Sequence, residues 1–147
     1  MLPNVTLLIV HAAVTWCLVG LIWTIQLVHY PLFDFVGEAG FTAYHTRHSS
    51  VISFLVGPLM LLELVTAGWL VLHPPPSVSA TPCWIGFALV LVIWASTAFV
   101  SVPIHARLGS GFDSGLVSTL VGTNWIRTVA WTARGVLILT ILLRALA

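Results

Sequence analysis

The sequence predicts an all-α fold, an integral membrane four-helix bundle with both termini on the same side. Of its 147 residues, 59% are hydrophobic and 6% are charged, and the mean hydropathy is +1.09. Soluble domains carry roughly 25% charged residues, so this composition excludes a surface that lies mostly in water. Four long apolar runs, separated by polar or proline-rich segments, each approach the roughly 20 residues that cross a bilayer. One transmembrane domain, residues 1–147, accounts for the whole length.

The predicted spans follow one another along the chain and are separated by three connections. They cover about residues 4–30, 50–72, 84–104 and 125–146. No basic segment precedes the first run, which is also too long for a signal peptide, so it predicts a transmembrane helix. The second connection, HPPPSVSATP, is a break that a helix does not cross. The third connection predicts a short interfacial helix that begins at Asp113 and ends at Gly122.

The polar side chains are distributed unequally between the two sides of the predicted bundle. Four spans put both termini and the second connection on one side, side A, and the first and third connections on side B. All five cations are arginines, and Arg47, Arg107 and Arg127 belong to side B. The positive-inside rule therefore predicts that side B is cytoplasmic and that both termini are outside. A net charge of +1 argues against a nucleic-acid partner and leaves the lipid bilayer as the expected surrounding.

Four histidines predict a site near side B. His29 lies at the end of the first span, His45 and His48 lie three residues apart at the start of the second, and His105 lies at the end of the third. They come from three helices at about one depth, and imidazole is a ligand for zinc, copper, iron and haem iron. These four are candidate ligands of a transition metal or haem. Two alternatives stay open: histidines that bond water, backbone or lipid headgroups, and histidines that act as acids or bases.

Three further polar residues near side B are candidate cofactor-binding donors. They are Gln26, Tyr30 and Asn124. Each is expected close to the histidines, where an amide or hydroxyl orients a ligand through a hydrogen bond.

The fourth span carries two arginines on one face. Asn124, Arg127, Trp131 and Arg134 recur at steps of three and four residues. A cation as deep as Arg134 needs a partner inside the bundle, and Glu63 is the only acid well inside a span, so we predict a buried Glu63–Arg134 pair. The pair is read either as a structural link between the second and fourth helices or as a charge relay or anion site.

Arg127 is predicted nearer to side B. Its planar guanidinium suits a carboxylate or phosphate, which makes it a candidate anion-binding residue. The alternative is that its side chain extends to the lipid headgroups.

Several strings resemble a family of short bacterial four-span membrane proteins: GLIWTIQLVHYPLF, YHTRHSSVISFLVGPLMLLELVTA, VSVPIHARLGSGFD and TNWIRTVAWTARG. The resemblance covers most of the chain and implies the fold but little function. Together with the arginine bias, it gives the expectation of a bacterial inner membrane with periplasmic termini. A weaker similarity, over the first two helices, rests on His11, Trp16, Gly20, Leu21, the LVHYP segment and Pro58. On these residues the chain resembles the small haem-containing membrane protoporphyrinogen oxidase. This similarity implies His11 as a haem ligand. The chain departs from that family at Ile25 and Gln26, where the family has a basic residue, and it contains no lysine.

The sequence supports three hypotheses of function. The first is a membrane protein that holds a metal or haem near side B, with redox chemistry if it is an enzyme, because the site offers imidazoles but no evident nucleophile. The second is a non-enzymatic accessory subunit of a larger respiratory or photosynthetic complex, which would bind a membrane-protein partner or further copies of itself. The third is a small transporter, which needs a polar path through the bundle.

Overall fold

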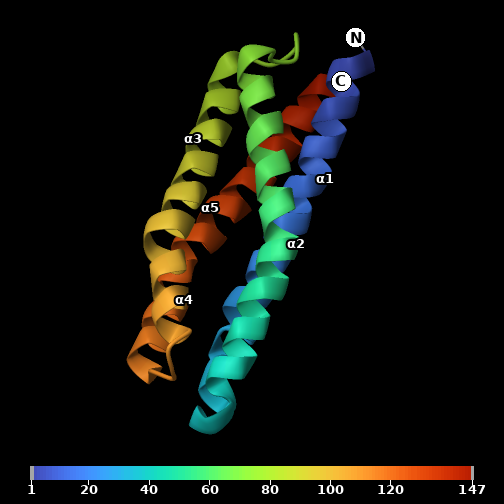
Figure 1. Cartoon of the computed structure of the whole chain (residues 1–147). Coiled ribbons are helices and arrows are strands. Elements are labelled where there is room, and N and C mark those ends of the chain that lie inside the picture. Colours follow the sequence, from blue (N-terminus) through green and yellow to red (C-terminus); the bar gives the residue numbers. More distant parts are fainter. Residues whose placement is uncertain (1, 147) are drawn as a thin grey trace.

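The described chain forms four long helical rods that pack side by side (Figure 1). A computed structural model describes the backbone of residues 2–146 and the side chains of residues 5–146. The segments are α1 (Leu2–Thr24), the π-helix η1 (Ile25–His29), the 3₁₀-helix η2 (Pro31–Phe35), α2 (Glu38–Leu72), α3 (Ala80–Ser96), the π-helix η3 (Thr97–Ser101), α4 (Val102–Leu108) and α5 (Ser114–Leu146). The described residues contain no strand, so the predicted all-helical class is confirmed.

Each rod is long and apolar enough to cross a membrane. These rods are Val5–Phe35, Glu38–Leu72, Ala80–Leu108 and Ser114–Leu146. The start of α1 and the end of α5 lie at the same end of the bundle (Figure 1). We call this the terminal end, and the opposite end, where α2 begins and α4 finishes, the histidine end.

In two places the helices extend beyond the predicted apolar runs. The second rod begins at Glu38 rather than near residue 50, so His45 and His48 lie inside the helix. The predicted interfacial helix is instead the first part of α5, and Gly122 lies within that helix rather than at its end. Leu120 is fully buried in the core, and burial of this kind outweighs the cost of about 1 kcal/mol for a glycine inside a helix.

Asp113 does cap this helix. The backbone N–H of Leu116 donates to Asp113 Oδ1 at 3.0 Å. An aspartate that precedes the first turn satisfies one of the N–H groups that a helix start leaves free. The cap therefore marks the start of α5 itself.

A proline follows each of the two π-helical turns. Pro31 follows η1 with one residue between, and Pro103 follows η3 in the same way. Proline lacks an N–H and its ring collides with the carbonyl four residues earlier, so a regular helix cannot continue unchanged through it. The wider turn is compatible with this local change, and Tyr30 N–H donates to Ile25 O, five residues back, at 3.0 Å. Both irregular turns lie toward the histidine end.

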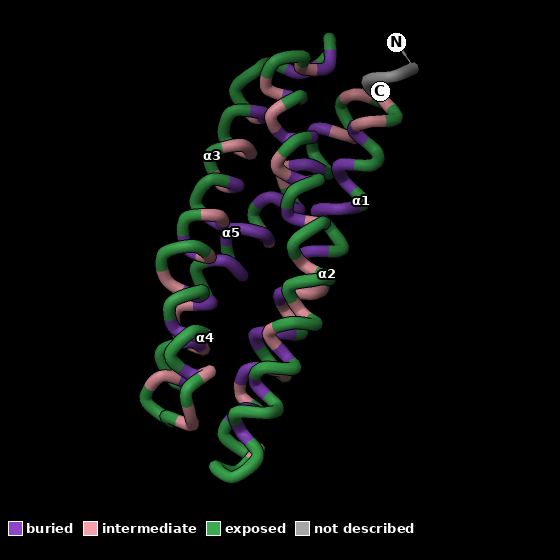
Figure 2. Tube along the Cα trace, in the orientation of Figure 1, coloured by how far each residue is buried: buried purple, intermediate pink, exposed green. Residues whose placement is uncertain are grey.

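Burial separates the inner from the outer faces of the rods (Figure 2). Core side chains such as Leu18, Ile93 and Trp131 are almost completely buried. Large apolar side chains also point outward, with Phe54 85% exposed and Phe99 80% exposed. Apolar outer faces on rods of this length fit a lipid environment, where a soluble bundle would have polar ones.

The helices α1 and α5 approach each other closely at Gly135. A Cβ atom on this glycine would lie 3.2 Å from a methyl group of Val19 and 3.3 Å from the ring of Trp16. The absence of a side chain therefore sets how near the two helices pack, as small residues do at helix contacts in membranes.

We expect Gly135→Leu to destabilise the bundle by about 1–3 kcal/mol, because the added side chain overpacks the α1–α5 contact. Gly122→Leu is the matched control: it gains the same helix propensity on the same helix, and nothing lies within 4 Å of its Cβ position. Denaturant or SDS titration of both variants in detergent measures the difference. Equal stability of the two variants would contradict the close approach.

Candidate functional site

The first group of buried polar side chains surrounds Arg134. We call it the ion-pair cluster, and it consists of His11, Thr15, Glu63, Thr66, Trp131 and Arg134. Arg134 Nε lies 3.1 Å from Glu63 Oε1, and both side chains are at most 3% exposed. The structure thus brings Glu63 and Arg134 together in direct contact, as the sequence predicts.

The remaining oxygens and N–H groups of this pair also have partners. The Glu63 carboxylate accepts hydrogen bonds from Thr15 Oγ1 and from Trp131 Nε1, each at 3.0 Å. Arg134 Nη1 donates to the carbonyl oxygen of Gly86, and its Nη2 lies 3.2 Å from His11 Nε2. Because buried charges need such complete pairing, this geometry is that of a satisfied and stable ion pair.

His11 lies in the ion-pair cluster, apart from the other candidate histidines. Arginine has only donors, so His11 Nε2 accepts from Arg134 and His11 Nδ1 carries the hydrogen. Nδ1 lies 2.7 Å from Thr66 Oγ1, whose own hydrogen reaches the Leu62 carbonyl at 2.7 Å. This arrangement leaves neither nitrogen of His11 free for haem iron.

The second group is the histidine cluster, which consists of His29, His45, His48 and His105. It lies near the histidine end and joins η1, α2 and α4. His29 Nε2 lies 2.7 Å from His48 Nδ1, and His45 Nε2 lies 2.9 Å from His105 Nδ1. The four predicted imidazoles are therefore neighbours, arranged as two hydrogen-bonded pairs.

The two pairs meet on α2, where His45 and His48 are three residues apart. Their ring centroids are 6.2 Å apart, and His48 lies 5.8 Å from His105. His45 Nδ1 and His48 Nε2 are buried and have no hydrogen-bond partner in the described chain. Among the described residues, no three His, Cys, Asp or Glu side chains form a group that could hold one metal ion.

Two phenylalanines enclose the histidine cluster, and the pattern of polar residues did not single them out. Phe33 and Phe41 are fully buried. The Phe33 ring packs edge-on against His45 and His48, and Phe41 stacks on His45 at 5.6 Å between centroids. These apolar rings pack directly on the imidazoles, which lowers the local polarity around them.

A third set of hydrogen bonds connects the helices between these clusters. Asn124 Nδ2 donates to Gln26 Oε1 at 2.8 Å, and Gln26 Nε2 donates to the Val121 carbonyl at 3.1 Å. Arg127 Nη2 lies 2.5 Å from Asn124 Oδ1 and 3.2 Å from the Tyr30 hydroxyl. Gln26 and Asn124 thus bond each other and do not touch the histidines.

Tyr30 joins Arg127 to the histidine cluster. Its hydroxyl lies 3.0 Å from His105 Nε2, so a chain of polar atoms runs from Arg127 through Tyr30 and His105 to His45. Such a chain passes polarisation, and in principle a proton, between its ends.

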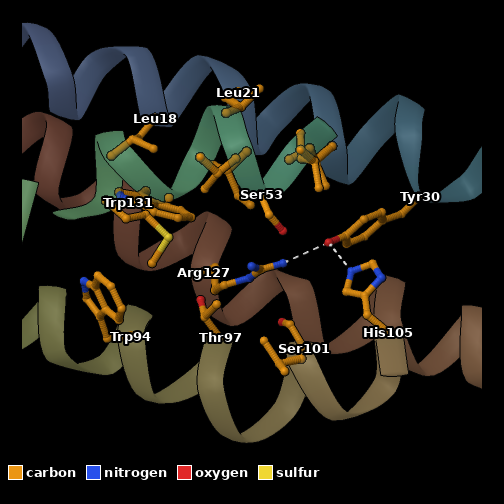
Figure 3. Close-up of a pocket in the computed structure, with 17 residues that line it drawn as sticks. Leu18, Leu21, Tyr30, Ser53, Trp94, Thr97, Ser101, His105, Arg127 and Trp131 are labelled. Carbon is orange, nitrogen blue, oxygen red and sulfur yellow. Dashed lines mark hydrogen bonds between the residues drawn. The ribbon is translucent and has the colours of Figure 1, made fainter. Parts of the chain in front are cut away.

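A cavity of about 220 Å³ lies between the rods next to this chain. Tyr30, Arg127 and His105 line one part of it, while Trp94 and Trp131 lie toward the other end (Figure 3). Leucine, isoleucine, valine and methionine side chains complete the wall. A mostly apolar cavity with a few convergent polar groups has the character of a small-molecule site.

Comparison of the chain with protein-family models, with curated proteins and with solved structures gave no match. Any statement of function therefore depends on the geometry of these clusters.

We expect Glu63→Gln to lower the stability of the bundle by about 3 kcal/mol, because it leaves the Arg134 guanidinium buried without its counter-charge. Glu38→Gln at the exposed start of α2 is the matched control, since it removes the same charge where water reaches it. SDS titration in detergent gives both values. If the two variants unfold alike, the ion pair does not hold the helices together.

Proposed function

We propose that the protein is a membrane metalloprotein in which the histidine cluster binds one redox-active transition-metal ion. The observation that carries the proposal is the pair of buried, unpartnered nitrogens, His45 Nδ1 and His48 Nε2. An unpartnered buried polar atom is costly and calls for an explanation, and a bound ion is one.

The arrangement around these two nitrogens supports ligand roles for their residues. A ligating histidine commonly donates its second ring N–H to a fixed acceptor, which sets its tautomer and orientation. His45 Nε2 faces His105 and His48 Nδ1 faces His29, so each candidate ligand has such an acceptor. In this proposal His45 and His48 bind the ion, while His29 and His105 orient them.

The distance between the two rings is compatible with one ion between them. With metal–nitrogen bonds of about 2.0–2.1 Å, two imidazoles on opposite sides of an ion have centroids roughly 6.4 Å apart. The centroids of His45 and His48 are 6.2 Å apart. Two protein nitrogens on one ion would leave other coordination positions open, as a reactive site requires.

The donor set favours copper or iron over a structural zinc site. Structural zinc is closed by four protein ligands, and the described side chains offer no group of three. Haem is less favoured than an ion, because the adjoining cavity of about 220 Å³ is below the roughly 300 Å³ of ordinary small-molecule sites. With imidazoles and aromatic rings at the site and no evident nucleophile, the chemistry that fits best is redox.

The proposal includes a location: a bacterial inner membrane, with the histidine end cytoplasmic and the terminal end periplasmic. Arg47 and Arg107 are exposed at the histidine end, and Arg144 is the one arginine in the last turn of α5. The excess of arginine at the histidine end supports this orientation by the positive-inside rule.

We expect purified protein to hold copper or iron near one equivalent, and His45→Ala and His48→Ala to remove it. His29→Asn and His105→Asn should weaken binding by about 10–100-fold, the usual effect of losing an orienting partner. His73→Ala is the matched control, because His73 is exposed at the terminal end and stacks only on Trp69. Elemental analysis after metal loading measures each variant. Folded wild-type protein that binds no ion above the level of the His45→Ala variant would overturn the proposal.

For the orientation, we expect Ser77→Cys to react with an impermeant maleimide in intact cells and Ser110→Cys to react only after permeabilisation. Ser77 and Ser110 lie in the exposed connections at opposite ends of the bundle. The native Cys17 and Cys83, which form no disulfide, are first replaced by alanine. The reverse labelling pattern would show the opposite orientation.

A further inference from the structure

Arg127 is a buried cation without a counter-charge. Its side chain is 6% exposed, and its two hydrogen-bond acceptors, the Tyr30 hydroxyl and Asn124 Oδ1, are neutral. Its Nε is buried and has no partner among the described residues. A cation at such depth costs at least about 2.5 kcal/mol, and neutral acceptors offset only part of that.

No acidic side chain in the described part of the chain neutralises Arg127. The sequence contains four acidic residues. Glu63 pairs with Arg134, and the other three, Asp34, Glu38 and Asp113, are exposed. The contrast between the two buried arginines of α5 indicates that the counter-charge of Arg127 comes from outside the chain.

The guanidinium of Arg127 faces the cavity of about 220 Å³, between its polar and apolar ends (Figure 3). The hydroxyls of Ser53 and Ser101 line the same space. The volume lies between the roughly 150 Å³ that accepts benzene and the roughly 300 Å³ of larger ligand sites. An acidic group with a ring or short chain fits this space.

A groove borders the cavity and has part of its wall in common with it. The groove, of about 400 Å³, lies between α2 and α4, and shares Ile52, Ser53, Val102 and His105 with the cavity. The groove also includes His45, Thr46 and Gly109, toward the histidine end.

We propose that this cavity binds a lipophilic carboxylate whose charge is held by Arg127. One guanidinium matches the single charge of a carboxylate, whereas a phosphate carries more oxygens and more charge than one arginine and two hydroxyls satisfy. The apolar body of the ligand lies toward Trp94 and Trp131, so the ω-end of a fatty chain lies near their rings. The site depends on Arg127 and the cavity, and it stands whether or not the histidine cluster binds an ion.

The test uses bromine quenching of tryptophan fluorescence, since Trp94 and Trp131 line the cavity. The probe is ω-bromodecanoate, added to chelator-treated, detergent-purified full-length protein, so that no metal contributes. We expect saturable quenching by the carboxylate, and only a weak linear decrease with its uncharged methyl ester. Arg127→Met should weaken binding by about tenfold or more, the usual loss when a hydrogen-bonded charge is removed. Arg107→Met, an exposed arginine on α4, is the matched control and should bind as the wild type does.

A second pair of variants tests the cavity without touching the charge. Gly57 lines the cavity, and nothing lies within 4 Å of its Cβ position, so Gly57→Leu adds bulk at the cavity wall where the added Cβ atom meets no neighbour. We expect it to abolish saturable quenching, while Gly20→Leu, exposed on α1 with the same open Cβ position, leaves it intact. Equal quenching by acid and ester, or unchanged binding in both Arg127→Met and Gly57→Leu, would overturn the proposal. Saturable quenching by ω-bromodecyl phosphate and not by the carboxylate would also overturn it, in favour of a phosphate ligand.

Discussion

The charge of Arg134 is held by groups from all four rods, and the packing of the bundle depends on this contact. From α5, the guanidinium reaches the Glu63 carboxylate on α2, His11 on α1 and the Gly86 carbonyl on α3. The Glu63 carboxylate also accepts hydrogen bonds from Thr15 on α1 and from Trp131 on α5. In an apolar surrounding no water is present to replace any of these partners. The four rods therefore have one relative position in which the charge is fully satisfied.

The same constraint explains the contrast between the two arginines of α5. Arg134 is surrounded by acceptors that the chain supplies, whereas Arg127, two turns earlier on the same face, has only neutral ones. A closed network serves stability, because nothing in it can be exchanged without leaving a charge unpaired. An incomplete network next to a cavity is suited to binding, because a ligand completes it. Helix α5 thus carries a structural arginine and a candidate ligand-binding arginine on one stripe.

The histidine end is built around two irregular turns. The π-helices η1 and η3 each precede a proline, and the segments that follow bring Tyr30 and His105 to 3.0 Å. In straight helices the residues of η1 and α4 would continue the stripes of α1 and α3 without interruption. With the wider turns, His29 of η1 and His105 of α4 instead lie next to His48 and His45 on α2. π-Helical turns of this kind are frequent at functional sites, which agrees with the polar groups gathered here.

The sequence by itself determined the helical class, the four apolar rods and the partnership of Glu63 with Arg134. The rods follow from the length of the apolar runs compared with the thickness of a bilayer. The ion pair follows because a deeply buried arginine requires a counter-charge, and Glu63 is the one acid placed well inside a span. It also predicted that His29, His45, His48 and His105 would be neighbours, because they share one depth. The start of α2 at Glu38 and the continuity of the helix capped by Asp113 with the fourth span escaped prediction, since the burial of Phe41 and Leu120 keeps these more polar segments helical.

Only the tertiary structure decided which nitrogen faces which. Periodicity places an imidazole on a face of a helix but does not set the rotation of its ring. The sequence therefore could not predict the pairs His29–His48 and His45–His105, or which nitrogens on α2 have no partner. Gln26 and Asn124 were expected beside the histidines, yet they bond each other, because the stripe of α5 that carries Asn124 faces Gln26 on the first rod. The cavity, too, arises from how the rods diverge and not from any one segment. Local sequence sets which groups are buried, while the angles and separations between helices decide which of them meet.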